Sequence, residues 1–174
     1  GGYGPGYTDI TEEYDGSTWT ESGDLSTDDR SNISGFGTQT AALGFGGYSS
    51  PPATWFHNAE EYDGSTWTAG GDMNTTADLR AGAGTQTAGV AFGGYTGSNT
   101  ANSEEYNGSA WTEGSNLNTS RRNLGSASNG TQTATLAFAG ATTAITAVTE
   151  AYDGTSWVNT SSMATARQAV AAGG

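Results

Sequence analysis

The apolar residues of the chain fall in short runs that end in Gly-Gly or Ala-Gly. Three runs share this form: "ALGFGG" (42–47), "GVAFGG" (89–94) and "TLAFAG" (135–140). Each run is too short for an ordinary helix, and flanking glycines are typical of tight turns. The pattern predicts three apolar strands. Each is expected to follow a strand of small residues such as "NLGSAS" (123–128) and a turn such as Asn129-Gly130.

A second pattern alternates polar and aromatic residues. "EEYDGSTWT" stands at 12–20 and again at 60–68, and altered copies stand at 104–112 and 150–158. In every copy a tryptophan follows a tyrosine by five residues. The pairs are Tyr14 and Trp19, Tyr62 and Trp67, Tyr106 and Trp111, and Tyr152 and Trp157.

These copies predict hairpins. Asp15-Gly16 suits a two-residue turn that needs positive φ, which pairs Tyr14 with Ser17 and Glu12 with Trp19. Period-2 alternation then places the tyrosine and the tryptophan on one face of each hairpin. We expect all four tryptophans to be buried between neighbouring units, because two aromatic side chains per copy form a packing face.

The copies recur every 44 to 48 residues and predict a repeat architecture. A long apolar residue and then an arginine follow each tryptophan at similar spacing. These residues are Leu25, Met73, Leu117 and Met163, then Arg30, Arg80, Arg122 and Arg167. The units run over about 1–29, 30–79, 80–120 and 121–166, and 167–174 begins a closing or further unit. Four strands per unit predict a β-propeller of about four blades, or a segment of a larger one.

The amino-acid composition supports the all-β prediction and excludes several classes of ligand. Only 33% of the 174 residues are hydrophobic and 28 are glycine, which disfavours helix. The 18 acidic residues face five arginines and no lysine, for a net charge of -13. Such a surface repels nucleic acid and anionic membranes. Without cysteine, no disulfide or thiolate metal site is expected. The chain also lacks an apolar run of the roughly 20 residues that a membrane helix needs.

The glycine pairs at 46–47 and 93–94, each followed by a Tyr and a spaced Trp, resemble the kelch repeat. The third unit departs from this pattern with Ala139-Gly140. The wording "YDGSTWT", "GTQTA" and "AFGG" is also similar to kelch-like arrays in virion-associated proteins of marine bacteriophages. The first resemblance implies four-stranded propeller blades, and the second implies the exterior of a virion.

Candidate chemistry gives little support for an enzyme or a cofactor. A copper site of the galactose-oxidase type needs Cys, Tyr and His, and the chain has no cysteine and one histidine. "DGSTW" resembles the Asp-box of sialidases, which is itself a structural turn. The pairs Glu12-Glu13, Glu60-Glu61 and Glu104-Glu105 could supply a glycosidase with carboxylates. Adjacent strand residues face opposite ways, so we interpret the pairs as solvated edge charges. Loops 23–29 and 70–78 hold oxygen ligands suited to calcium, without a recognised spacing.

One segment departs from the repeat. Residues 48–59, "YSSPPATWFHNA", contain Trp55, Phe56 and His57, which have no counterparts in the matching stretches "YTGSNTANS" (95–103) and "ATTAITAVT" (141–149). These side chains either form a protruding contact or cover the edge or interface of a blade. The sequence predicts a non-enzymatic structural or interaction propeller, in a virion tail, fibre or decoration or on a cell surface. A carbohydrate-binding propeller is the alternative, and a glycoside hydrolase is a third reading. Expected partners are virion or surface proteins, glycans and further copies of the chain.

Overall fold

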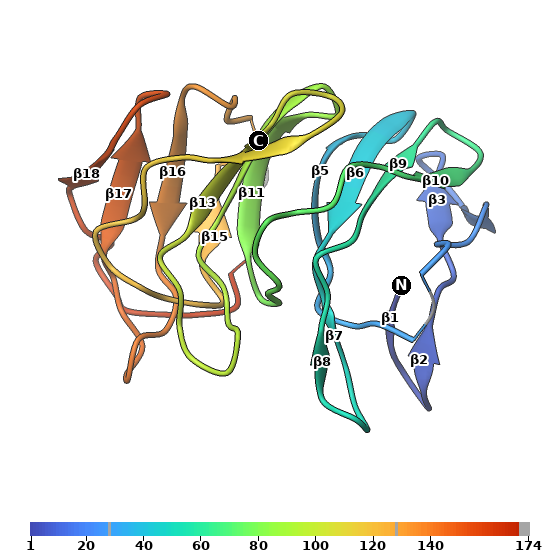
Figure 1. Cartoon of the computed structure of the whole chain (residues 1–174), viewed down its shortest axis with the longest axis horizontal. Helices are drawn as coiled ribbons and strands as arrows, with labels where there is room; N and C mark the ends of the chain where they lie inside the picture. The colour runs from blue at the N-terminus through green and yellow to red at the C-terminus, as the bar shows by residue number, and fades with distance from the viewer. Residues whose placement is uncertain (28, 128, 171–174) are drawn as a thin grey trace.

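The computed structural model describes residues 1–27, 29–127 and 129–170, and these residues form only strands, turns and loops (Figure 1). Because the described part contains no helix, it offers none that could cross a membrane. The all-β prediction is therefore confirmed. Most of the described strands belong to three antiparallel sheets of four strands each.

Each four-stranded sheet is antiparallel and its strands follow chain order, with a hairpin over residues 48–55 inserted between the second and third strands of the first sheet. Sheet 1 contains β5 (Ser34–Thr38), β6 (Ala41–Phe45), β9 (Ala59–Tyr62) and β10 (Trp67–Ala69). Sheet 2 contains β11 (Ala81–Thr85), β12 (Ala88–Phe92), β13 (Ser103–Tyr106) and β14 (Trp111–Glu113). Sheet 3 contains β15 (Gly125–Ser126), β16 (Thr135–Phe138), β17 (Thr149–Tyr152) and β18 (Trp157–Thr160).

Three two-stranded hairpins complete the described strands. They are β1 (Gly2–Tyr3) with β2 (Tyr7–Thr8), β3 (Glu12–Tyr14) with β4 (Trp19–Glu21), and β7 (Tyr48–Ser49) with β8 (Thr54–Trp55). Sheet 3, sheet 2, sheet 1 and β3 follow one another from left to right across Figure 1. The hairpin β3–β4 corresponds to the last two strands of a sheet. Of the expected unit at 167–174, residues 171–174 lie outside the described part.

The aromatic hairpins form, but with a register that differs from the prediction. Tyr14 lies opposite Trp19, and the other three pairs match it. Four residues, not two, connect the strands. The Asp15 carboxylate accepts hydrogen bonds from the backbone N–H groups of Ser17 and Thr18, at 2.7 and 2.8 Å. Only Gly16 takes positive φ, at 99°. The aspartate therefore closes the turn with its side chain, and tyrosine and tryptophan still share one face.

This turn gives a pH-dependent prediction at Asp63, the equivalent of Asp15. Backbone N–H donation from Thr66, followed by bonds from Ser65, lowers the pKa of Asp63 to about 2. A lowered folded-state pKa adds stability above the unfolded value near ~4, and that stability is lost as the pH falls toward ~2. Asn107 builds the same turn with an amide oxygen. We therefore expect Asp63→Asn to fold normally and to lose less stability than the wild type between these pH values. Chemical denaturation across that range measures the difference. An Asp63 titration midpoint near ~4 by NMR would contradict the account.

The turn between the first two strands of each unit also differs from expectation. It lies at Gln39-Thr40 and Gln86-Thr87 in sheets 1 and 2, because Thr38 pairs with Ala41 and Thr85 with Ala88. In sheet 3 the corresponding turn is Gln132-Thr133, closed by the bridge between Thr131 and Ala134. Asn129 does lie in a turn, since Gly130 N–H donates to Ala127 O at 2.9 Å, but the tip of the hairpin is Gln132-Thr133 and not Asn129-Gly130 as expected.

The glutamine of this turn reaches the neighbouring sheet. Gln86 Nε2 donates to the carbonyl oxygens of Ala42 and Tyr62 in sheet 1, at 3.0 and 2.8 Å. Gln132 makes the same two bonds to Gly89 and Tyr106 in sheet 2. A side-chain amide thus fastens each of these sheets to the one before it. We refer to this pair of bonds as the glutamine latch.

The core lies between neighbouring sheets. Trp111 packs edge-on against Phe45 of sheet 1, with ring centroids 5.4 Å apart. Trp157 packs in the same way against Phe92 of sheet 2, at 4.7 Å. Both tryptophans are buried, as predicted. The prediction fails for the other two, because Trp67 is half-buried and Trp19 is 67% exposed.

Candidate functional site

The first glutamates of two repeated pairs, Glu60 and Glu104, are buried, as is Glu150 in the fourth copy, which corrects the interpretation of those two pairs as solvated edge charges, whereas Glu12 is exposed as expected. Glu60, Glu104 and Glu150 are each at most 1% exposed. Each forms an ion pair with a buried arginine. The pairs are Arg30 with Glu60, Arg80 with Glu104 at 3.3 Å, and Arg121 with Glu150 at 3.2 Å. Burial lowers the pKa of each guanidinium, and the neighbouring carboxylate opposes that shift.

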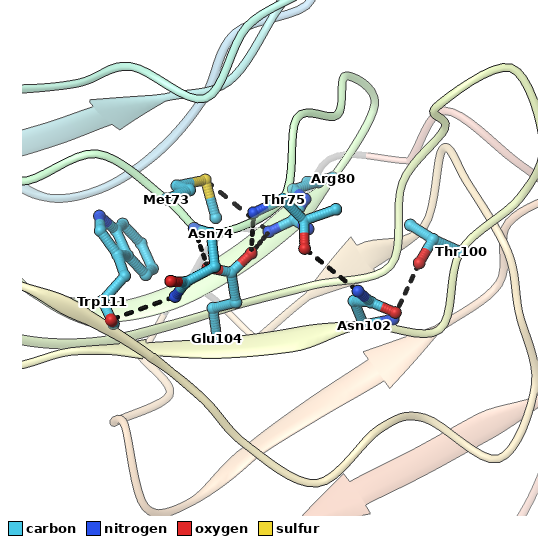
Figure 2. Close-up of polar contacts among 8 residues, drawn as sticks. All are labelled: Met73, Asn74, Thr75, Arg80, Thr100, Asn102, Glu104 and Trp111. Atoms are coloured by element: carbon cyan, nitrogen blue, oxygen red, sulfur yellow. Dashed lines mark hydrogen bonds and ion pairs between the residues drawn. The ribbon is translucent and has the colours of Figure 1, made fainter.

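Figure 2 shows the surroundings of Glu104. Its carboxylate accepts hydrogen bonds from the backbone and side-chain nitrogens of Asn74, at 2.7 and 3.1 Å, and from Thr75 N. The Asn74 amide also donates to Trp111 O at 3.1 Å. The loop that enters sheet 2 is thereby tied to the last two strands of that sheet. With the guanidinium and these N–H groups around it, the carboxylate has a structural role.

The arginine assignment in the third complete unit also needs correction. The spacing singled out Arg122, but its neighbour Arg121 carries the ion pair. Arg121 also donates to the carbonyl oxygens of Ala137, Ala139 and Val148. Arg122 points elsewhere, with its guanidinium 4.7 Å from the centre of the Tyr95 ring. Its guanidinium donates to Asn99 Oδ1 at 2.7 Å and takes no part in a buried ion pair among the described residues.

The second glutamate of a pair serves the next unit. The hydroxyl of Tyr106 donates to Glu61 at 2.5 Å, and that of Tyr152 donates to Glu105 at 2.6 Å. Tyr62 donates to Glu13 in the same way. Burial, followed by the bond to Glu61, raises the pKa of Tyr106 to about 12. The repeated glutamates therefore hold the sheets together.

A groove of about 600 Å³ lies between the hairpin β3–β4 and sheet 1. Phe36, Leu43 and Trp67 give it apolar walls, and Glu12 and Trp19 also line it. In each complete sheet, an apolar strand (β6, β12 or β16) pairs with the strand that corresponds to β3. Among the described residues, β3 pairs only with β4. The groove therefore adjoins a strand edge whose backbone groups are unpaired.

The irregular segment 48–59 folds back onto the molecule in part. Trp55 is half-buried between Tyr48 and Tyr95, with ring centroids 5.4 and 6.2 Å away. Phe56 is also half-buried and does not share these contacts. His57 is half exposed, with its Nε2 3.8 Å from Asp72 Oδ2. The structure thus separates the three proposed binding residues and brings only Trp55 into a site with other aromatic residues.

That site is a cleft of about 310 Å³, which we call the Trp55 cleft. Its principal lining side chains are Asn32, Tyr48, Trp55, Asp78, Tyr95 and Arg122. Tyr48 and Trp55 come from the hairpin β7–β8, and the other four come from the loops that enter sheets 1, 2 and 3 and from the loop between β12 and β13. Burial raises the pKa of Asp78, while the side chains of Asn32 and Trp55 oppose that shift.

Among the described residues, no cluster of three His, Cys, Asp or Glu side chains is placed to hold a metal ion. One of the two loops considered for calcium, 23–29, includes residue 28, which lies outside the described part. No protein-family model matches the chain, and a search of curated proteins finds no match. The candidate sites therefore rest on their geometry alone.

Proposed function

We propose that the chain is a non-enzymatic interaction module in which four-stranded units are arranged as the blades of a β-propeller. The observation that carries this proposal is the groove beside β3. Three internal copies of the same place are each filled by an apolar strand that ends in Gly-Gly or Ala-Gly. The groove therefore suits a strand of that kind, which would join the edge of β3 by strand addition.

The walls of the groove support this occupant. Phe45 and Phe92 of the internal strands each pack against the tryptophan of the following sheet. The equivalent tryptophan for the groove is Trp67, which lines it and is only half-buried. A phenylalanine on the incoming strand would complete this contact. The strand would also pair with the free edge of β3, which otherwise exposes backbone donors and acceptors.

The acid chemistry of the chain supports a scaffold over an enzyme. Glu60, Glu104 and Glu150 are held in buried ion pairs, so they are not placed to act as the paired carboxylates of a glycosidase. The net charge of -13 favours partners without a strong negative charge. We place the module on the exterior of a virion or cell, and its partners are proteins of that surface, including further copies of this chain.

A peptide tests the groove directly. The peptide "QTAGVAFGG" copies residues 86–94, and a control peptide carries serine in place of its phenylalanine. We expect saturable binding of the first peptide, measured by tryptophan fluorescence and calorimetry, and at least about tenfold weaker binding of the control, because the ring contact is lost.

Failure of both peptides to bind, or equal binding of the two, would contradict the proposal. Sedimentation of the protein up to about 1 mM, where even a contact of roughly 4 kcal/mol is populated, tests whether a second copy supplies the strand. Concentration-dependent association that the first peptide abolishes supports this source. A monomer at every concentration rules the source out.

A further inference from the structure

The Trp55 cleft has aromatic walls that the scaffold does not require. Tyr48, Trp55 and Tyr95 follow one another around it, and each is half-buried, so part of each side chain remains accessible. In sheet 3 the position that corresponds to Tyr48 and Tyr95 is Ala141, as the equivalent bridges show. A unit therefore forms without an aromatic residue at this place. The rings offer flat apolar surface to a ligand.

The cleft also contains a buried acceptor and a buried donor, the Asp78 carboxylate and the Trp55 indole N–H, which interact with each other without a well-formed hydrogen bond. Asp78 is 5% exposed, and its Oδ2 accepts a hydrogen bond from the Asn32 amide at 3.1 Å. Neither its Oδ1 nor the Trp55 indole nitrogen makes a hydrogen bond of normal geometry within the described residues. Buried polar groups that lack a well-formed hydrogen bond are uncommon in native proteins, because their desolvation cost is not fully offset. A ligand hydroxyl can both donate to a carboxylate oxygen and accept from an indole N–H.

Equivalent positions in successive units carry different chemistry here. Ser31, Asp78 and Arg122 occupy the same place, because each forms an antiparallel bridge with the residue that follows the Gly-Gly or Ala-Gly pair. The backbone bridge recurs in all three units, and it does not depend on which side chain stands at this position. Asp78 and Arg122 both line the cleft, where the Arg122 guanidinium lies over Tyr95 and donates to Asn99 at 2.7 Å. The cleft therefore combines a carboxylate (Asp78), a guanidinium (Arg122) and an amide (Asn32) with the aromatic rings.

We propose that the Trp55 cleft binds a neutral saccharide, with one sugar ring packed against the aromatic side chains and its hydroxyls on Asp78, Arg122 and Asn32. Sugars combine C–H faces that suit aromatic rings with hydroxyls that both donate and accept. The volume of about 310 Å³ lies at the small end of ligand pockets and suits one ring of a larger glycan. An anionic ligand fits less well, since Asp78 faces the cleft and the net charge is -13.

Methyl glycosides of glucose, galactose, mannose and N-acetylglucosamine are the test ligands, with acetate and inorganic phosphate as anionic comparisons. NMR follows the indole N–H resonances during each titration. We expect at least one glycoside to shift the Trp55 resonance saturably, with a Kd of roughly 1 mM or below. The resonance of Trp19, which lies outside the cleft, should not move.

Two matched variants separate the cleft from the fold. Asp78→Asn removes the buried carboxylate and is expected to weaken glycoside binding at least tenfold, because hydrogen bonds to charged groups are among the strongest. Asp63→Asn makes the same chemical change in a turn outside the cleft and should leave binding unchanged. Tyr95→Ala tests the aromatic wall independently and should weaken binding to a similar extent.

The proposal is overturned if no glycoside moves the Trp55 resonance at about 10 mM, well above a Kd of roughly 1 mM. It is also overturned if acetate or phosphate binds more tightly than every glycoside, or if both aspartate variants bind alike. The wild-type titration decides the matter even if Asp78→Asn fails to fold. This site is independent of the groove beside β3, so either can fail without the other.

Discussion

Replacing Arg121 by methionine is expected to lower the free energy of unfolding by about 3 to 5 kcal/mol, the usual result of removing one partner of a buried ion pair. Arg121 and Glu150 are both fully buried, with 3.2 Å between Nη2 and Oε1. Methionine fills much of the space but leaves the carboxylate without its counter-charge. It also removes donors to three backbone carbonyl oxygens. Urea denaturation followed by circular dichroism measures the loss.

The neighbouring arginine provides the control. Arg122→Met changes the same side chain one residue later, where the guanidinium is partly exposed and lies over Tyr95. We expect this variant to cost about 1 kcal/mol or less. The double variant Arg121→Met with Glu150→Gln should regain part of the loss, because the amide oxygen can still accept from Asn118. Equal destabilisation by the two single variants would show that the buried pair has no special role.

Replacing Trp111 by alanine is expected to cost about 3 to 5 kcal/mol, as for other large buried side chains. Trp111 is 5% exposed and packs against Phe45, with Phe36 and Tyr106 beside it. Its loss opens a cavity between sheets 1 and 2 that backbone pairing prevents from closing. The thermal midpoint and the denaturant midpoint should both fall.

Trp19→Ala is the matched comparison within the same repeated motif. This tryptophan packs at a tilt against Tyr14 of its own hairpin and is 67% exposed, so we expect a loss of no more than about 1 kcal/mol. Trp67→Ala should fall between the two. A loss as large for Trp19 as for Trp111 would mean that the hairpin β3–β4 is covered in solution, and would locate the interface of a partner.

Much of the fold could be predicted because the residues of the repeat have strong local preferences for strands and turns. The interval between Tyr62 and Trp67 fixes a shared face, and the short apolar runs bounded by glycine fix the strands. The turns were harder to predict. An Asp-Gly pair suggests a two-residue turn, but the free carboxylate of Asp15 captures two backbone N–H groups and lengthens the connection. A two-residue turn and a four-residue turn closed by the aspartate have similar free energies, so the residue types alone do not show which of them forms.

The buried glutamates were missed because charge alone indicates exposure. Two features of the sequence carry the opposite signal. The chain has five arginines and no lysine, and the arginine guanidinium suits buried carboxylate pairs better than the lysine ammonium does. At least one arginine also recurs in each complete unit. In the third complete unit, the spacing could not show which arginine pairs with Glu150, because Arg121 and Arg122 are adjacent in the sequence. Only the backbone path determines which of the two side chains is buried.

The Trp55 cleft lay beyond sequence reasoning for a geometric reason. Asn32 and Arg122 are separated by two units of the chain, and they meet only because successive sheets stack side by side. Trp55 was recognised because it interrupts the repeat. Asp78 and Tyr95 lie within the regular repeat, so nothing in the sequence around them indicated a binding site.

The glutamine latch has a consequence for the evolution of the number of repeat units. Its acceptors are main-chain carbonyl oxygens at Ala42, Tyr62, Gly89 and Tyr106, and a carbonyl is present whatever residue stands there. Any unit can therefore adjoin any other without matched side chains at this contact. The coding sequences of "EEYDGSTWT" at 12–20 and 60–68 specify identical residues and offer sites for unequal crossing-over. Gain or loss of a whole unit would preserve the latch, so relatives of this protein should differ in length by multiples of one repeat.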